Sequence, residues 1–148
     1  MRWLVLLCLV PCAAQATDLH ITVEYVMTQE RVRPDPKTVY PHMTRHFILH
    51  EGGGIDETSL VRGAHPDANE GSTRLGKDRF RVVNAQTITR SWSTGAQKRT
   101  LTVTTNGTGC KATLSISGAN EFTAPSVDHG VPGVYRNAQL QSISCKIE

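Results

Sequence analysis

The chain has 148 residues, a hydrophobic content of 39%, a charged content of 20% and a formal net charge of +3. This length is typical of one domain, and the near-neutral charge argues against a nucleic-acid-binding protein with a strongly basic face. No stretch after the first dozen residues is apolar enough to span a bilayer, so a polytopic membrane protein is also excluded.

The first 16 residues are typical of a secretory signal peptide. Arg2 is followed by an apolar run from Trp3 to Val10, and Ala14-Gln15-Ala16 supplies the small residues that a signal peptidase recognises. The run is too short to cross a membrane. We therefore expect residues 1–16 to be removed and residues 17–148 to form a single β domain, exported to the periplasm or the extracellular space, with no transmembrane segment.

Alternation of apolar and polar residues dominates the rest of the chain. Every odd position from Leu19 to Met27 is apolar, which predicts a half-buried strand. Asn106-Gly107 predicts a tight hairpin between two further strands. Other strand-like runs cover residues 44–50, 79–83, 86–92, 98–105, 110–116 and 143–147. The pattern predicts an all-β antiparallel sandwich of about seven strands, with a small β-barrel as the alternative.

Residues 51–78 form the longest stretch without this alternation. The stretch is rich in glycine, and only Ser59-Leu60-Val61 interrupts its polar character. We therefore expect a long Gly-rich loop, which is either a contact surface or poorly ordered. Its last part, residues 71–78, resembles a phosphate-binding loop, but Asp78 replaces the required hydroxyl and a strand follows instead of a helix.

The densest basic cluster lies at the end of this stretch and consists of Arg74, Lys77, Arg79 and Arg81. Such a cluster is a candidate surface for an anionic partner, such as a polysaccharide, a lipid headgroup or an acidic protein. The alternative is that the charges protect a strand edge against aggregation.

Histidines at positions 42, 46 and 50 are the candidate metal ligands for zinc or copper. A helix would stack neighbouring members of this set, whereas a strand would place His42, His46 and His50 on one face but too far apart to share an ion. A strand would still allow one or two of them to combine with His20, His65 or His129. The alternative is that these histidines face solvent and bind nothing.

Two of the four cysteines, Cys8 and Cys12, belong to the signal segment. The remaining pair, Cys110 and Cys145, has only one possible partner each, and an exported protein reaches an oxidising compartment. Both residues are in phase with the apolar face of their strands. The sequence therefore predicts one disulfide in the core.

Catalytic motifs are not evident. The chain has no G-x-S-x-G nucleophile elbow and no thiol outside the expected disulfide. We therefore expect no catalytic residues and a non-catalytic, exported or envelope-associated binding domain whose partner is a protein or a glycan. The alternative is a periplasmic zinc- or copper-binding protein that uses the His42/His46/His50 region, and a hydrolase has the least support. No cofactor is expected apart from that metal ion.

Overall fold

Two antiparallel sheets make up the computed structural model, which describes residues 17–63, 67–107, 109–122 and 134–148. The expected signal segment, residues 1–16, lies outside the described residues. Among the described residues there is no helix, and so none that is long and apolar enough to cross a membrane.

The larger sheet is built around one long N-terminal strand. In spatial order it contains β11 (Tyr135–Ile147), β1 (Leu19–Arg31), β3 (His42–Leu49), β4 (Ile55–Arg62) and β5 (Ala68–Leu75), while β2 (Lys37–Val39) also pairs with β1. The alternation that predicts the first strand is confirmed, because Ile21, Val23 and Tyr25 are all buried. Their side chains face the second sheet, and the intervening even residues face outward.

The smaller sheet is a meander of consecutive strands. Its order is β10 (Ala119–Asn120), β9 (Gly109–Ile116), β8 (Gln97–Asn106), β7 (Thr87–Thr94) and β6 (Arg81–Asn84). The hairpin predicted at Asn106-Gly107 is confirmed, since β8 and β9 pair antiparallel on either side of it.

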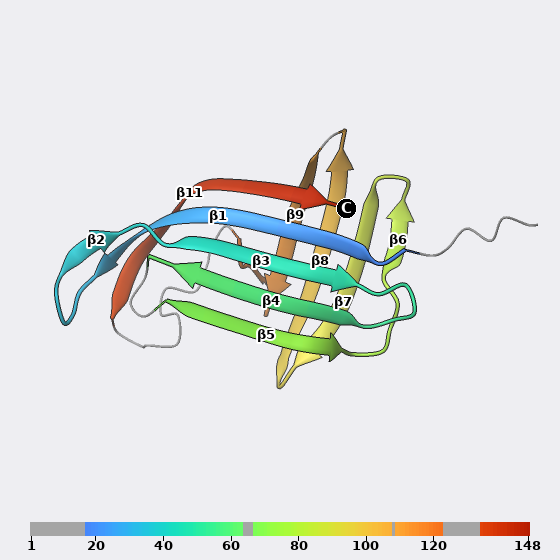
Figure 1. Cartoon of the computed structure of the whole chain (residues 1–148), viewed down its shortest axis with the longest axis horizontal. Helices are drawn as coiled ribbons and strands as arrows, with labels where there is room; N and C mark the ends of the chain where they lie inside the picture. The colour runs from blue at the N-terminus through green and yellow to red at the C-terminus, as the bar shows by residue number, and fades with distance from the viewer. Residues whose placement is uncertain (1–16, 64–66, 108, 123–133) are drawn as a thin grey trace, which may run out of the picture.

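The strands of the two sheets cross steeply rather than running along one another (Figure 1). The apolar core lies between them. Phe47 of β3 packs against Trp92 of β7 at a ring separation of 6.2 Å, and Tyr25 of β1 packs against Phe122 at 5.6 Å. The sandwich architecture is thus confirmed.

A disulfide joins the two sheets. Cys110 of β9 and Cys145 of β11 are bonded, with their Cα atoms 5.1 Å apart. Because β11 is the outermost strand of the larger sheet, the bond ties an edge strand of that sheet to the smaller sheet. The predicted pairing is therefore confirmed.

The expectation of a loop over residues 51–78 is wrong. Residues within this stretch form β4 and β5, and only the segments around them turn. Three of the glycines that indicated a loop, Gly52-Gly53-Gly54, lie in the tight turn between β3 and β4. Gly53 has a φ of +102°, and a Cβ there would lie 2.3 Å from the carbonyl oxygen of Lys77. The structure therefore has more strands than the seven expected from the sequence.

A buried ion-pair network crosses between the sheets near the other side of the sandwich. Glu57 of β4 is 6% exposed and accepts hydrogen bonds from Arg99 of β8 at 2.8 and 2.9 Å. Arg45 of β3 donates to Glu57 at 3.2 Å and to Glu121 at 3.4 Å. A polar hollow of about 160 Å³, lined in part by Glu57 and Arg99, opens beside this network. The charges therefore neutralise one another across the sheet interface.

The disulfide should contribute strongly to stability. On the loop-entropy model, closing a loop with a sequence separation of 35 residues is worth about 4 kcal/mol. We expect the free energy of unfolding, measured in urea, to fall by about this amount in the Cys110→Ala/Cys145→Ala variant and in the reduced wild-type protein. Thiol titration of the unfolded, unreduced protein 17–148 should find no free cysteine. Two free thiols, or a change below about 1 kcal/mol, would contradict the account.

Glu57 offers a second stability prediction. Glu57→Gln leaves Arg45 and Arg99 without the carboxylate that they share. We expect the free energy of unfolding, measured by chemical denaturation, to fall by about 3 kcal/mol. This value is at the lower end of the range for broken buried ion pairs because the adjacent hollow admits solvent. The matched control is Glu30→Gln, which breaks the solvent-exposed pair with Arg136 and should have a much smaller effect. If the two substitutions lowered the free energy of unfolding equally, the buried network would contribute no more to stability than the exposed ion pair, which would contradict this prediction.

Candidate functional site

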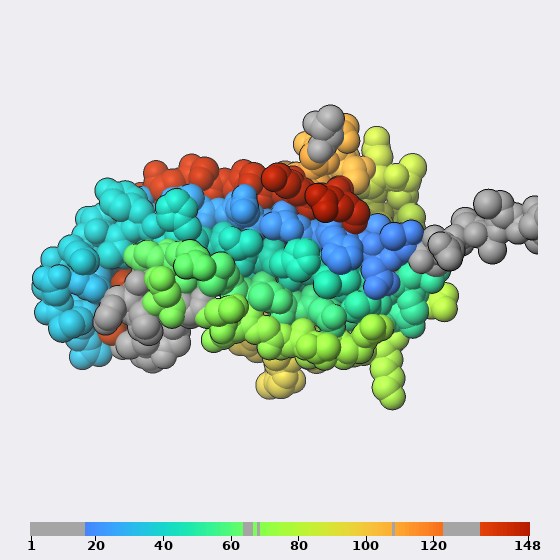
Figure 2. All heavy atoms as spheres, viewed as in Figure 1, coloured from blue at the N-terminus to red at the C-terminus, as the bar shows by residue number. Residues whose placement is uncertain are grey.

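The outer face of the larger sheet, on which β11, β1 and β3 lie side by side (Figure 2), carries two adjoining hollows. A hollow of about 240 Å³ adjoins a second of about 310 Å³, and the two share Glu24 and Ser144. The first hollow, which we call the outer groove, is lined by His20, Thr22, Glu24, His46, Ser144, Lys146 and Glu148.

Strand register explains why these residues meet. Thr22 lies opposite His46 on β3 and opposite Lys146 on β11, so the three form one row across the sheet. Glu24 likewise lies opposite Ser144. Because successive side chains of a strand point to opposite faces, the even residues of β1 face outward while the odd residues fill the core. The groove is thus the polar counterpart of the core on the same three strands.

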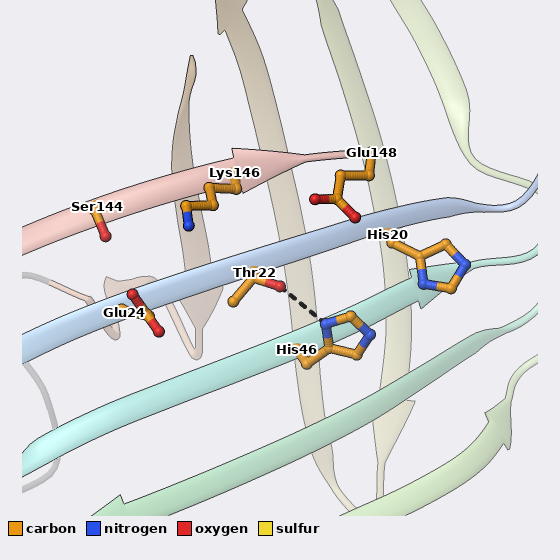
Figure 3. A pocket seen from close by; sticks show the side chains of 7 residues that line it. All are labelled: His20, Thr22, Glu24, His46, Ser144, Lys146 and Glu148. Atoms are coloured by element: carbon orange, nitrogen blue, oxygen red, sulfur yellow. Dashed lines mark hydrogen bonds between the residues drawn. The ribbon is translucent and has the colours of Figure 1, made fainter. Parts of the chain in front are cut away.

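Two imidazoles occupy one end of the groove. The Nδ1 atom of His46 lies 3.0 Å from the hydroxyl oxygen of Thr22, and the ring centroids of His20 and His46 are 5.7 Å apart (Figure 3). Glu148 lies at the same end (Figure 3). The groove therefore combines two imidazoles, an ammonium group, two carboxylates and hydroxyls, all of which are hydrogen-bonding groups.

The three histidines predicted as metal ligands do not meet. His42 and His46 both face outward from β3, but an extended strand separates residues four apart by about 13 Å. His42 lines the second hollow, and His50 follows the end of the strand. No three His, Cys, Asp or Glu side chains of the described residues stand in position to hold a metal ion together. His65 and His129 lie outside the part of the chain that the structure describes.

His50 instead connects the start of β1 to β4. It is 8% exposed, and its Nδ1 and Nε2 atoms lie 2.7 Å from Asp18 and 3.0 Å from Asp56, respectively. The backbone N–H of Glu51 donates to Asp18 at 3.0 Å, and that of Arg74 donates to Asp56. This arrangement, which we call the His50 clasp, is structural because both ring nitrogens already have partners.

The clasp shifts the titration of both carboxylates. The pKa of Asp18 is lowered by the hydrogen bond from the Glu51 backbone and then by His50. Partial burial raises the pKa of Asp56, but the hydrogen bonds from the Arg74 backbone and from His50 outweigh it, so the pKa is lowered overall. Both groups therefore favour the ionised form in the folded protein.

The predicted basic cluster is distributed along the connection from the larger to the smaller sheet. Arg74 lies in β5 and donates to the carbonyl oxygen of Gly53 at 3.2 Å, so its guanidinium has a structural role. Lys77, Arg79 and Arg81 are exposed, and Arg81 begins β6. These residues stay a candidate surface for an anionic partner.

Sequence reasoning did not identify most of the groove. Glu24, Lys146 and Glu148 were not singled out because each is an ordinary polar residue in an alternating strand. The useful signal was the polar face of the first strand. Its partners, however, follow from the pairing of β1 with β11, which lies more than 100 residues away in sequence.

Comparisons with protein-family models, with curated proteins and with solved structures returned no match for this chain. The groove is therefore interpreted from its own geometry and chemistry.

The His50 clasp makes stability depend on acidity. Because both aspartates have folded-state pKa values below their ordinary value, their stabilisation is fully present above about pH 4 and is lost as the pH falls through the lowered values. We expect Asp56→Asn to lower the melting temperature at pH 6 and to flatten its decline below about pH 4. Glu51→Gln is the control, because its backbone contact with Asp18 is retained. An unchanged acid slope in Asp56→Asn would contradict this interpretation.

Proposed function

We propose that the protein is an exported, non-catalytic binding module and that the outer groove binds a glycan. The observation that carries the proposal is the lining of the outer groove, which combines hydroxyl, carboxylate, imidazole and ammonium groups from three strands and adjoins a second hollow at Glu24 and Ser144. The hydroxyls of a sugar act as both donors and acceptors, and a lining of this kind offers them partners of both types.

The polarity of the surface favours a glycan over a protein. Stable protein interfaces place aromatic and apolar side chains at their centre. Among the large apolar residues exposed in the described ranges, only Ile143 borders the hollows, while Tyr40, Val82 and Val83 line none of them. A protein partner would find no aliphatic, Phe, Tyr or Trp side chain among the residues that line the outer groove, whereas Val26, Met43 and Ile143 line the second hollow.

The outer groove and the second hollow together have room for an extended ligand of a few sugar units. The two hollows adjoin at Glu24 and Ser144, so a ligand chain can run from Glu148 at one end toward His42 at the other. No Phe, Tyr or Trp side chain lines the first hollow for stacking on a sugar. Affinity therefore comes from hydrogen bonds and is modest for each sugar unit.

Export rests on two observations. The first 16 residues have the composition of a signal peptide, and the remaining cysteines form a disulfide of the kind that persists in oxidising compartments. A periplasmic or extracellular location is also where a glycan-binding module meets polysaccharide.

A glycan array probed with the protein 17–148, followed by calorimetry on the hits, tests the proposal. Loss of one charge-assisted hydrogen bond costs about 1.5–3 kcal/mol, so we expect Lys146→Ala to weaken binding about tenfold or more. Glu24→Gln should also weaken binding, because Glu24 lines both the outer groove and the second hollow.

The matched control is Lys98→Ala, the same substitution on β8 of the other sheet, which should leave the affinity unchanged. Equal affinity of Lys146→Ala and wild type would move the binding site away from the groove. An array without hits, together with a protein partner whose binding depends on Lys146, would overturn the glycan assignment.

A further inference from the structure

The two imidazoles of the groove have a geometry that goes beyond glycan binding. In the pairing of β1 with β3, His20 lies opposite Ile48 and His46 lies opposite Thr22. The two histidines are therefore diagonal neighbours on the outer face, within reach of one another. We propose that His20 and His46 form a two-histidine site for an exchangeable divalent transition-metal ion, Cu²⁺ or Zn²⁺.

The separation of the rings is close to what a shared metal requires. Two imidazoles bound to one tetrahedral ion at a metal–nitrogen distance of about 2.0–2.1 Å have their ring centroids roughly 5 Å apart. The observed separation is 5.7 Å, with an angle of 46° between the ring planes. His20 is exposed, so its side chain has room to rotate toward a shared ion.

Thr22 orients one of the two ligands. When the Nδ1–H of His46 donates to the Thr22 hydroxyl, the Nε2 atom carries the lone pair and is free to bind the ion. Histidine ligands of metals are commonly held in this way through the second ring nitrogen. Thr22 is therefore a positioning residue of the site.

Glu148, just past the C-terminal end of β11, is the candidate oxygen ligand, which has to rotate inward to reach the ion. Its backbone and that of His20 exchange two hydrogen bonds of 2.9 Å, and both side chains line the same hollow (Figure 3). A set of two imidazole nitrogens and one carboxylate oxygen suits Zn²⁺ and Cu²⁺.

The strength of binding follows from the same geometry. The described side chains contain no ready-made group of three ligands, so the carboxylate must rotate inward or water must complete the coordination. The ammonium of Lys146 lines the same hollow and repels a cation. These features favour a dissociation constant in the micromolar range, with Cu²⁺ bound more tightly than Zn²⁺.

Calorimetric titration of the metal-free protein 17–148 with Cu²⁺ and Zn²⁺, without any glycan, tests the proposal. We expect one ion per chain, and at least a tenfold loss of affinity in both His20→Ala and His46→Ala. His42→Ala is the matched control, because His42 is an exposed histidine on the same strand as His46 but at its other end. Melting curves establish that each variant is folded.

Spectroscopy tests whether Thr22 orients the His46 imidazole toward the ion or only stabilises the fold. The electron paramagnetic resonance spectrum of the Cu²⁺ complex should show coupling to two imidazole nitrogens, reduced to one in either single variant. Thr22→Val keeps both imidazoles but should weaken binding about tenfold and change the spectrum. A purely structural Thr22 would change the melting temperature and leave the spectrum unaltered.

The metal and glycan proposals can fail independently. Lys146→Ala should strengthen metal binding, because a positive charge is removed, yet weaken glycan binding. The metal site is refuted if His42→Ala costs as much affinity as His46→Ala, if His20→Ala has no effect, or if neither ion binds more tightly than millimolar.

Discussion

The disulfide between Cys110 and Cys145 holds the strand on which the outer groove depends. β11 is the edge strand of the larger sheet, so it has a hydrogen-bonded neighbour on one side only, β1. Cys145 points inward and joins it to β9, while the adjacent residues Ser144 and Lys146 point outward and line the groove. One covalent bond thus limits how far β11 can separate from the smaller sheet. The bond constrains both the groove and the core because alternate residues of β11 point into the groove and into the core.

The buried charges around Glu57 tie the sheets at a different place. β4 lies toward the opposite edge of the larger sheet from β11, and its inward-facing carboxylate meets Arg99 of the smaller sheet. A buried ion pair adds little net stability compared with apolar packing, but it strongly penalises arrangements in which either charge lacks its partner. Apolar contacts supply the driving force for packing, and the network selects one alignment of the two sheets. The steep crossing of the sheets is thus held by a covalent tie on one side and an ionic tie toward the other.

Local patterns in the sequence predict much of the fold. The alternation from Leu19 to Met27, the Asn106-Gly107 hairpin and the disulfide all follow from short-range signals or from simple elimination, and the structure confirms each of them. The expectation for residues 51–78 was wrong because glycines at the turn after β3 dominated the composition of the window. The inward face of β4 also carries the polar residues Glu57 and Ser59 between Ile55 and Val61, so apolar alternation does not reveal it. Val82, within the strand-like run 79–83, is 62% exposed because β6 is the outermost strand of its sheet.

The candidate site depends on pairings that no local pattern reveals. His46 was identified as a ligand candidate, but its neighbours in space come from β1 and β11 rather than from His42 and His50. Only the register of three strands brings His20, Thr22 and Glu148 to its side. Pairings between strands that are far apart in sequence are set by the topology of the whole sheet, so composition and local spacing do not specify them.

Hydrogen–deuterium exchange on the oxidised and the disulfide-free protein tests the central claim that the bridge holds the groove in place. Under conditions where both forms are folded, we expect the Cys110→Ala/Cys145→Ala variant to lose amide protection selectively in residues 142–147, while β3 and β4 keep theirs. Unchanged protection in residues 142–147, or an equal loss in β3 and β4, would contradict it.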